Sequence, residues 1–261
     1  MTGKWLAIEK VKMLHYRTFW VILALYTLML VAGYYLSGSF GSLSVNNQQI
    51  NLPELTVFAF PGLWHYLTYI SGFLHYILAL TVIALTANDL QYGLWRQHVA
   101  EGMDRSELIG AKVLVMMLLA LYSTLLVILT GLAFGLSHTA DADLALVLES
   151  AGFLIGYGVQ AFAYMTLAFL FAVVVQRAGT AIILLLVYAV VGERLILFLL
   201  PEPLSFYLPM AAFSAIISNP FMTLFGIEVA DSPFTTAFYI SLAWIVMLLG
   251  AAYAFLRYND V

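Results

Sequence analysis

Cysteine is missing from the sequence, and charged residues make up only 9% of its 261 positions. Without cysteine the chain cannot form disulfides or thiolate metal sites, and the redox compartment is left open. The ten basic and fourteen acidic residues give a net charge of -4, and the basic ones are scattered, so nothing in the sequence favours binding to nucleic acid. Soluble domains carry about 25% charged residues, which excludes an ordinary soluble chain here.

Motifs that carry catalysis are also missing. The sequence contains no H-E-x-x-H, no G-x-S-x-G and no paired glutamates ahead of a distant arginine, and its five histidines lack metal-ligand spacing. It contains no G-x-x-x-x-G-K-[ST], because the nearest candidate, Gly102 to Lys112, has the wrong glycine spacing and enters an apolar run. We therefore expect a protein that is not itself an enzyme, has no metal site and binds no cofactor.

Apolar sequence is abundant instead. Hydrophobic residues make up 64% of the chain, and several runs have the roughly 20 apolar residues that a bilayer-crossing helix needs. They predict an all-α integral membrane protein with a single domain, residues 1–261, because six spans joined by short loops leave no room for a separate globular unit. The predicted spans are residues 19–36, 63–87, 113–134, 153–175, 180–200 and 235–255.

The N-terminal residues are predicted to stay on the mature protein. Charges precede the first apolar run, as in a signal peptide, but Phe19 to Tyr35 is too long for one and ends in bulky tyrosines. Residues 4–17 have the pattern of an elbow helix lying in the membrane interface, and an ordinary basic flank that fixes topology is the alternative. The apolar face of that helix comprises Ala7, Ile8, Val11 and Leu14.

Two regions between spans are predicted to lie on the outer side. Residues 37–55 are rich in turn-forming and neutral polar residues and contain no Lys or Arg, which is typical of an external loop. Residues 201–234 contain an apolar core long enough to cross the membrane, but Asn219-Pro220 breaks it. Because the acidic segment that follows also lacks Lys and Arg, we expect an outer re-entrant or interfacial helical hairpin rather than a crossing.

The basic residues test this topology. All but one fall on the side assigned to the cytoplasm, as the positive-inside rule predicts, and the exception, Arg194, lies inside the fifth span. Adding or deleting one crossing would degrade that distribution, so we expect six spans with both termini in the cytoplasm. The basic residues on the cytoplasmic side are Lys4, Lys10, Lys12, Arg17, Arg96, Arg105, Lys112, Arg177 and Arg257.

The longest polar stretch of mixed charge, Asn88 to Lys112, lies between the second and third spans. Asn88 or Asp89 can cap a short helix, and a glycine at 102 would end it. Its apolar residues Leu90, Leu94 and Trp95 would rest on the membrane or the bundle, and Gln91, Arg96, Gln97 and Glu101 would face a partner.

A second helix is predicted to start inside the same stretch. Asp104-Arg105-Ser106-Glu107 has the spacing of a capping box, with the acid at the cap and a glutamate three residues later, and the helix continues into the third span. The stretch therefore predicts a rigid helix, turn and helix. The alternative is a loop that is merely solvated.

These residues carry a family resemblance. The segments Gly93-Leu94-Trp95-Arg96-Gln97, Gly102-Met103-Asp104-Arg105-Ser106-Glu107 and Gly110-Ala111-Lys112, together with the order of elements, resemble the permease subunits of type-two ABC exporters, and particularly the small bacterial permeases. The architecture is similar over essentially the whole chain, whereas the sequence motif is confined to residues 88–112. Asp104 is a departure, since related chains often have Ser there, but aspartate keeps the capping chemistry.

The resemblance implies a mechanism. In this family the segment between spans two and three is a coupling helix, which docks in a groove of a separate cytoplasmic ATPase and transmits the closure of the ATPase dimer. It implies two ATPase subunits that bind ATP and Mg²⁺, a second permease copy or paralogue, surrounding lipid, and the bacterial inner membrane. The residues implied to couple are Gln91, Gly93, Trp95, Arg96, Gln97, Glu101, Gly102, Met103, Asp104, Arg105 and Glu107.

Ionisable residues within the spans are the other candidates for function, because each costs from about 2.5 kcal/mol upward in a bilayer. Glu193 and Arg194 lie in the fifth span and His75 lies in the second. Neighbouring residues on a helix point about 100° apart, so Glu193 and Arg194 are expected to find partners on other helices or on a polar ligand. The sequence is compatible with two roles for these residues, polar bonding within the bundle and contact with a substrate.

The function expected is that of the membrane-spanning subunit of an ATP-driven exporter. The alternatives are an ion-gradient-driven carrier, a non-transporting subunit of a larger complex, and an intramembrane enzyme built on Glu193 and His75. Carriers usually bury several acidic or broken-helix sites near the midplane and contain internal repeats, which this sequence does not show. A cavity between two such bundles would suit a lipid, a lipid-linked glycan or an amphipathic drug.

Overall fold

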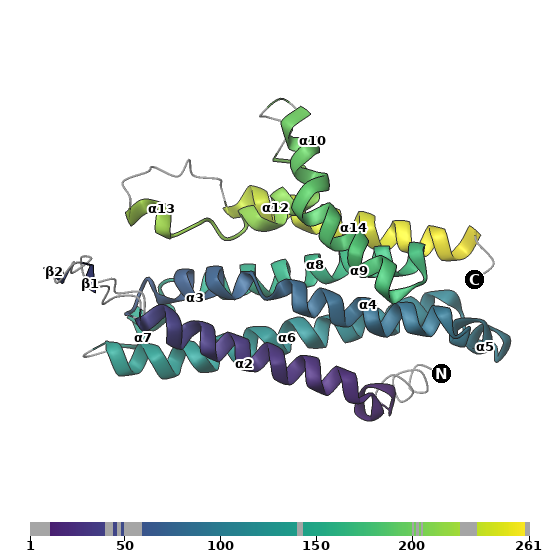
Figure 1. Cartoon of the computed structure of the whole chain (residues 1–261), viewed down its shortest axis with the longest axis horizontal. Coiled ribbons are helices and arrows are strands. Elements are labelled where there is room, and N and C mark those ends of the chain that lie inside the picture. The colour runs from purple at the N-terminus through teal and green to yellow at the C-terminus, as the bar shows by residue number, and fades with distance from the viewer. Residues whose placement is uncertain are drawn as a thin grey trace.

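A computed structural model of the chain describes residues 11–39, 44–45, 48–49, 59–139, 143–199, 201, 204, 206–224 and 234–258. Long helices dominate these residues and lie side by side as a bundle (Figure 1). Five of them are long and apolar enough to cross a membrane, and a bent pair makes a sixth. The predicted all-α class with about six apolar helices is confirmed to that extent, and the helices indicate a multi-pass membrane protein.

The helices of the described residues are α2 (Arg17–Ser39), α3 (Leu63–Gly72), α4 (His75–Gln91), α5 (Leu94–Ala100), α6 (Arg105–His138), α7 (Leu144–Leu148), α8 (Gly152–Val175), α9 (Ala178–Val187), the π-helical turn η2 (Tyr188–Gly192), α10 (Glu193–Leu199), α12 (Pro209–Ala215), α13 (Phe221–Leu224) and α14 (Phe234–Tyr258). Two short strands, β1 (Ser44–Val45) and β2 (Gln48–Gln49), pair antiparallel within the predicted external loop.

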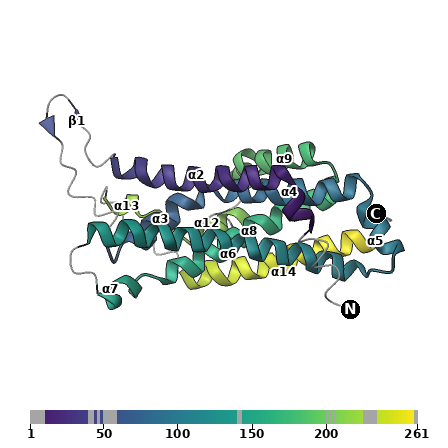
Figure 2. The ribbon, with the colours of Figure 1, turned by 90° about the horizontal axis from the view of Figure 1, so that it is seen from below.

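The bundle has two ends, which we name after the short helix found at each. The α5 end also holds the beginning of α2 and the last turn of α14, whereas the α7 end holds α13 and the β1–β2 pair (Figures 1 and 2). Successive long helices run between these ends in alternate directions, as short connections between apolar helices require.

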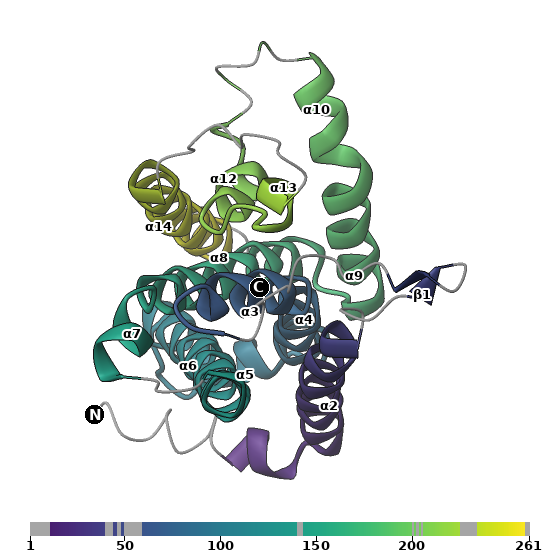
Figure 3. The same cartoon turned by 90° about the vertical axis from the view of Figure 1, so that its left-hand side faces the viewer.

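The central helix is α8, which packs against α4, α6 and α14 (Figure 3). Small residues on its buried faces, such as Gly156, Ala161 and Ala168, allow these neighbours to approach closely, the usual basis of helix association in membranes. A hydrogen bond of 2.8 Å between the buried hydroxyls of Tyr26 and Tyr157 also links α2 to α8.

The predicted second span, residues 63–87, is not one straight helix. It begins at Leu63, the first residue of the predicted span, but α3 ends at Gly72 and α4 follows at an angle of 43°. Kinks of this size occur at Ser and Gly pairs and where a hydroxyl bonds back into its own helix. Ser71 does so here, since its hydroxyl donates to the carbonyl of Leu67 at 2.6 Å immediately before Gly72.

The fifth apolar helix leaves the bundle. It runs from Ala178 to Leu199, close to the predicted residues 180–200, but contains the π-helical turn η2, where the Glu193 N–H donates to the Tyr188 carbonyl five residues earlier. Beyond that turn α10 stands away from the other helices (Figure 3). Its end is exposed accordingly, with Phe198 at 88% of its full accessibility.

The region predicted as an outer hairpin contains two short helices, α12 and α13, in its described part, and neither is long enough to cross a bilayer. The predicted break is present, because α12 ends at Ala215 and α13 starts at Phe221, and in the turn between them the side chain of Asn219 accepts the N–H of Phe221 at 3.0 Å. Residues 202–203, 205 and 225–233 lie outside the described residues. Of the predicted elbow, residues 4–10 also lie outside them and residues 11–15 are helical.

Two glycines set the packing of α6 against α3. Gly131 and Gly135 lie four residues apart on one face of α6, the small-xxx-small pattern of close helix pairs. A Cβ atom added at Gly131 would lie 2.5 Å from the ring of Trp64, and one at Gly135 would collide with the ring of Phe60. Trp64 has little room to move, since its indole N–H donates to the carbonyl of Val147 at 2.7 Å.

We expect Gly131→Leu to lower the free energy of unfolding by about 1–3 kcal/mol, because Trp64 must move and break that bond. Thermal unfolding of the purified protein in detergent micelles measures the effect. Gly250→Leu on α14 is the matched control, since no atom of another described element lies within 4 Å of a Cβ added there. If both variants unfold at the same temperature, the close approach of α6 and α3 is not important for stability.

Candidate functional site

The polar stretch 88–112 forms two turns around one short helix at the α5 end of the bundle. The prediction that Asn88 or Asp89 caps this helix is wrong, because α4 continues through both residues to Gln91. The reason is tertiary: both side chains are held by other elements while their backbone stays helical. The cap position of α5 is Gly93 instead, whose φ of +70° favours glycine because a Cβ atom would strain it.

The second turn agrees with the prediction. Gly102 ends α5 with a φ of +90°, again a conformation suited to glycine. Asp104 and Glu107 then form the predicted capping box, in which each side chain accepts the backbone N–H of the other residue. The helix that starts there, α6, continues without interruption to His138, so the second turn is fixed rigidly to a long apolar helix.

The short helix α5 has a buried and an exposed face. Trp95 is 4% exposed within the hydrophobic core, Leu90 just before the helix is also buried, and Met103 packs against the same core. The opposite face is polar and open, and Gln97 donates to Glu101 along it at 3.2 Å. The exposed members of the predicted set are Gln91, Arg96, Gln97, Glu101, Gly102 and Asp104.

A buried carboxylate, which the sequence analysis did not single out beyond a capping role, joins this segment to the bundle. Asp89 is 7% exposed and accepts from the ammonium of Lys112 at 2.6 Å and from that of Lys12 at 3.4 Å. Asn88 donates to the hydroxyl of Tyr16 at 3.1 Å. These bonds tie α4 to α6 and to the residues just before α2. The sequence did contain a signal for the Asp89–Lys112 pair, because this acid and this lysine lie at the facing ends of two neighbouring apolar runs.

Arg105, predicted as a coupling residue, is bonded to another helix of the same chain. Its guanidinium donates to the backbone carbonyls of Leu256 and Arg257, the latter at 2.8 Å. Those carbonyls belong to the last turn of α14, where backbone carbonyls lack N–H donors from the same helix and a cation is favourable. Arg105 therefore connects the start of α6 to the end of α14 rather than lying on the open face of α5.

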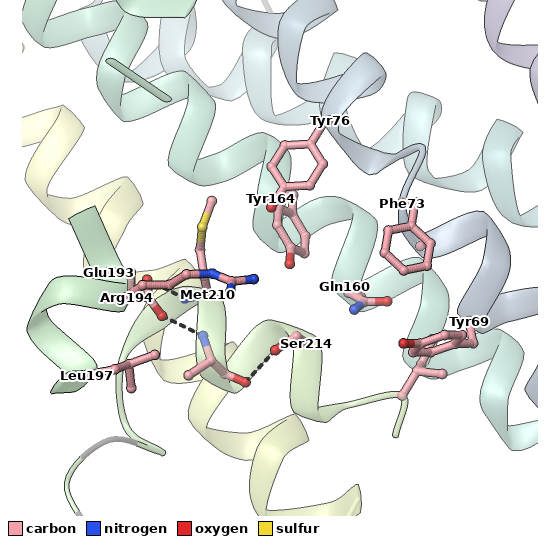
Figure 4. A pocket seen from close by; sticks show the side chains of 13 residues that line it. Tyr69, Phe73, Tyr76, Gln160, Tyr164, Glu193, Arg194, Leu197, Met210 and Ser214 are labelled. Carbon is pink, nitrogen blue, oxygen red and sulfur yellow. Dashed lines mark hydrogen bonds between the residues drawn. The ribbon is translucent and has the colours of Figure 1, made fainter. Parts of the chain in front are cut away.

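Glu193 bonds to another helix, one of the two kinds of partner predicted for it. It is 3% exposed, and its two carboxylate oxygens accept the N–H groups of Met210 at 3.0 Å and Ala211 at 2.6 Å, at the start of α12 (Figure 4). Arg194 points away from those bonds, toward Tyr164 and Gln160 (Figure 4). Within the described residues these neighbours form no ion pair with each other.

His75 is fully buried between the rings of Tyr157 and Tyr164, at centroid distances of 4.6 and 5.8 Å. Neither ring nitrogen has a hydrogen-bond partner among the described residues. Glu193 lines a cavity that is described below, and His75 is not among the residues that line it. The structure therefore does not bring His75 and Glu193 together in that cavity. In the described part of the chain no three His, Cys, Asp or Glu residues are grouped as a metal site.

No protein-family model matches this chain, and no curated protein matches it. The geometry described above and the sequence pattern are therefore the basis for assigning a function.

Proposed function

We propose that this chain is the membrane-spanning subunit of an ATP-driven exporter of the ABC type, and that its α5 segment, residues 88–112, docks on a separate ATPase. One observation carries the proposal: the longest polar stretch of mixed charge in the sequence forms a short helix with its apolar face buried and its polar face open, at one end of an apolar bundle. Such a surface serves as a rigid docking element for a soluble partner.

The distribution of charge supports a cytoplasmic location for the α5 end. Lys12 and Arg17 before and at the start of α2, Arg96 in α5, Arg177 after α8 and Arg257 at the end of α14 all belong to this end. Cytoplasmic ends of membrane proteins are enriched in Lys and Arg. On this proposal both termini are cytoplasmic in a bacterial inner membrane, residues 4–17 lie in the inner interface, and α12 and α13 form a re-entrant hairpin at the outer face.

The contacts around the α5 segment support transmission of motion. Asp89 bonds α4 to α6, and Arg105 bonds α6 to α14, so a displacement of α5 is carried to three long helices at once. Two ATPase subunits that bind ATP and Mg²⁺ would drive the displacement, and a second copy or paralogue of this chain would complete the path for cargo. An ion-gradient-driven carrier would not need an open polar helix at one end of the bundle.

Purification of the tagged chain from its native membrane in a mild detergent tests the proposal. We expect a protein with Walker motifs to be recovered in comparable amounts, with ATPase activity in the eluate. A charge swap, Arg96→Glu with Glu101→Arg, keeps the net charge but reverses the pattern on the exposed face. It should reduce recovery about ten-fold or more, which corresponds to a loss of about 1.4 kcal/mol at an interface.

The matched control is Arg177→Glu, an exposed charge at the same end of the bundle but outside the α5 segment. Its recovery of ATPase should equal that of the wild type. A chain that purifies without any ATPase, or a charge swap that leaves the recovery unchanged, would count against the exporter assignment.

A further inference from the structure

A cavity of about 420 Å³ lies between α10 and the bundle, in the half nearer the α7 end. Its walls come from α3, α4, α8, α10 and α12, and the break between α3 and α4 forms part of its rim (Figure 4). Phe73 at that break is 64% exposed, so the rim opens on the outer surface of the bundle, where lipid surrounds a membrane protein. Binding sites for small molecules commonly have volumes of about 300–1,000 Å³.

Two charged side chains line this cavity, and only Glu193 has a charge-compensating partner among the described residues. Glu193 has both carboxylate oxygens bonded to backbone N–H groups of α12, which offset its negative charge. Arg194 has an exposed side chain that extends across the cavity toward Tyr164 (Figure 4), and it forms no ion pair with any residue of the described chain. A guanidinium at this depth in an apolar helix calls for an anionic partner.

Gln160 provides an independent indication of a ligand. It is 6% exposed, and its amide N–H donates to the carbonyl of Phe213 at 3.0 Å, which fixes the orientation of the amide. The amide oxygen is buried and has no partner in the described part of the chain. It points toward the side of the cavity where Phe73 and Tyr69 lie (Figure 4). A buried acceptor of this kind is normally matched by a donor.

We propose that this cavity binds the head group of an anionic amphiphile. The Arg194 guanidinium would bind a phosphate through two parallel N–H bonds, a geometry that suits arginine better than lysine. A hydroxyl or ammonium group of the same head group would donate to the oxygen of Gln160. The acyl chain would leave past the exposed ring of Phe73 into the surrounding lipid, since the cavity has room for a head group but not for a whole lipid.

Binding of the amphiphile in this cavity does not depend on the proposed function. A role for the amphiphile as the transported cargo would rest on that function. The assay below therefore contains neither ATP nor an ATPase. A binding result and a failed recovery of ATPase can thus be told apart, because the first concerns the cavity and the second concerns the α5 segment.

The experiment uses the full chain in a neutral detergent with three probes: oleoyl lysophosphatidylglycerol, which has phosphate, hydroxyls and an acyl chain; monooleoylglycerol, which lacks the phosphate; and glycerol 1-phosphate, which lacks the chain. Native mass spectrometry and the shift of the unfolding temperature measure binding. We expect the first probe to bind about ten-fold or more tightly than the other two, since only it satisfies Arg194, Gln160 and the apolar rim.

Arg194→Gln should weaken lysophosphatidylglycerol binding about ten-fold, and Arg194→Lys should weaken it less because the charge remains. Arg177→Gln, the same change at the exposed turn between α8 and α9, should bind like the wild type. Since the Arg194 side chain is exposed, neither substitution there should alter the unfolding temperature without ligand. Unchanged binding by Arg194→Gln, equal binding of monooleoylglycerol, or equal binding of glycerol 1-phosphate would each overturn the proposal, the last in favour of a free phosphate ester.

Discussion

Asp89→Leu is expected to lower the free energy of unfolding by about 3–5 kcal/mol, the usual cost of removing one partner of a buried ion pair. Lys112 is only 4% exposed, and its ammonium lies 2.6 Å from the Asp89 carboxylate. An exposed ion pair would contribute much less, usually below about 1 kcal/mol. Chemical unfolding in detergent micelles, followed by far-ultraviolet circular dichroism, measures the difference.

A double substitution distinguishes the loss of the whole ion pair from the loss of only one of its two charges. Asp89→Leu combined with Lys112→Met should recover most of the lost stability, because an apolar pair of similar volume often replaces a buried ion pair without loss. Lys112→Met alone should cost less than Asp89→Leu, since Lys12 still lies 3.4 Å from the carboxylate. Asp143→Ala, which removes an exposed carboxylate that caps α7, is the control and should cost about 1 kcal/mol. A loss below that of the control for Asp89→Leu would contradict the buried-pair interpretation.

Trp95→Ala is the second substitution with a large expected effect, here on the stability of α5. The helix α5 has seven residues, which is too short for a helix to be stable by itself in water, so its conformation depends on how it is anchored. Trp95 supplies that anchor, being 4% exposed in the core, and removal of a buried aromatic side chain costs about 3–5 kcal/mol. We expect the backbone amides of α5 to exchange their hydrogens about 100-fold faster or more, which corresponds to about 3 kcal/mol.

Arg96→Ala is the matched control for this experiment because it changes the neighbouring residue on the exposed face of the same helix. It should leave the exchange rates close to those of the wild type, yet weaken the recovery of an ATPase if the proposed function is correct. Equal protection of α5 in Trp95→Ala and in the wild type would mean that the two glycine turns hold the helix without the tryptophan.

Local sequence patterns predicted much of this structure. Turn chemistry predicted the capping box at Asp104, because it depends only on residues within three positions. Trp95 lies in the core, one of the two environments predicted for it, and Glu193 bonds to another helix, one of the two kinds of partner predicted for it. Apolar runs likewise located the long helices, since the length needed to cross a bilayer is nearly constant.

Features that depend on distant contacts were not predicted. The continuation of α4 to Gln91 reflects bonds that hold Asn88 and Asp89 to residues 72 and 77 positions away. The placement of Arg105 on the end of α14 joins residues about 150 positions apart, and periodicity carries no information about such pairs. The bend at Gly72 was missed because the sequence on both sides is equally apolar.

The π-helical turn η2 contains one residue more than an α-helical turn, and it thereby sets which residue of the fifth helix faces α12. Each residue removed from a helix rotates everything after it by about 100°. A deletion between Tyr188 and Gly192 would convert the turn to α-helix and keep Glu193 in place, since its N–H bond to the Tyr188 carbonyl would then span four residues. A deletion in α9 would instead move Arg194 into the place of Glu193, and the two N–H groups of α12 would then meet a group that has no acceptor. Homologous chains can thus exchange one apolar residue for another in this helix, whereas a gain or loss of one residue in α9 would have to be compensated before Glu193.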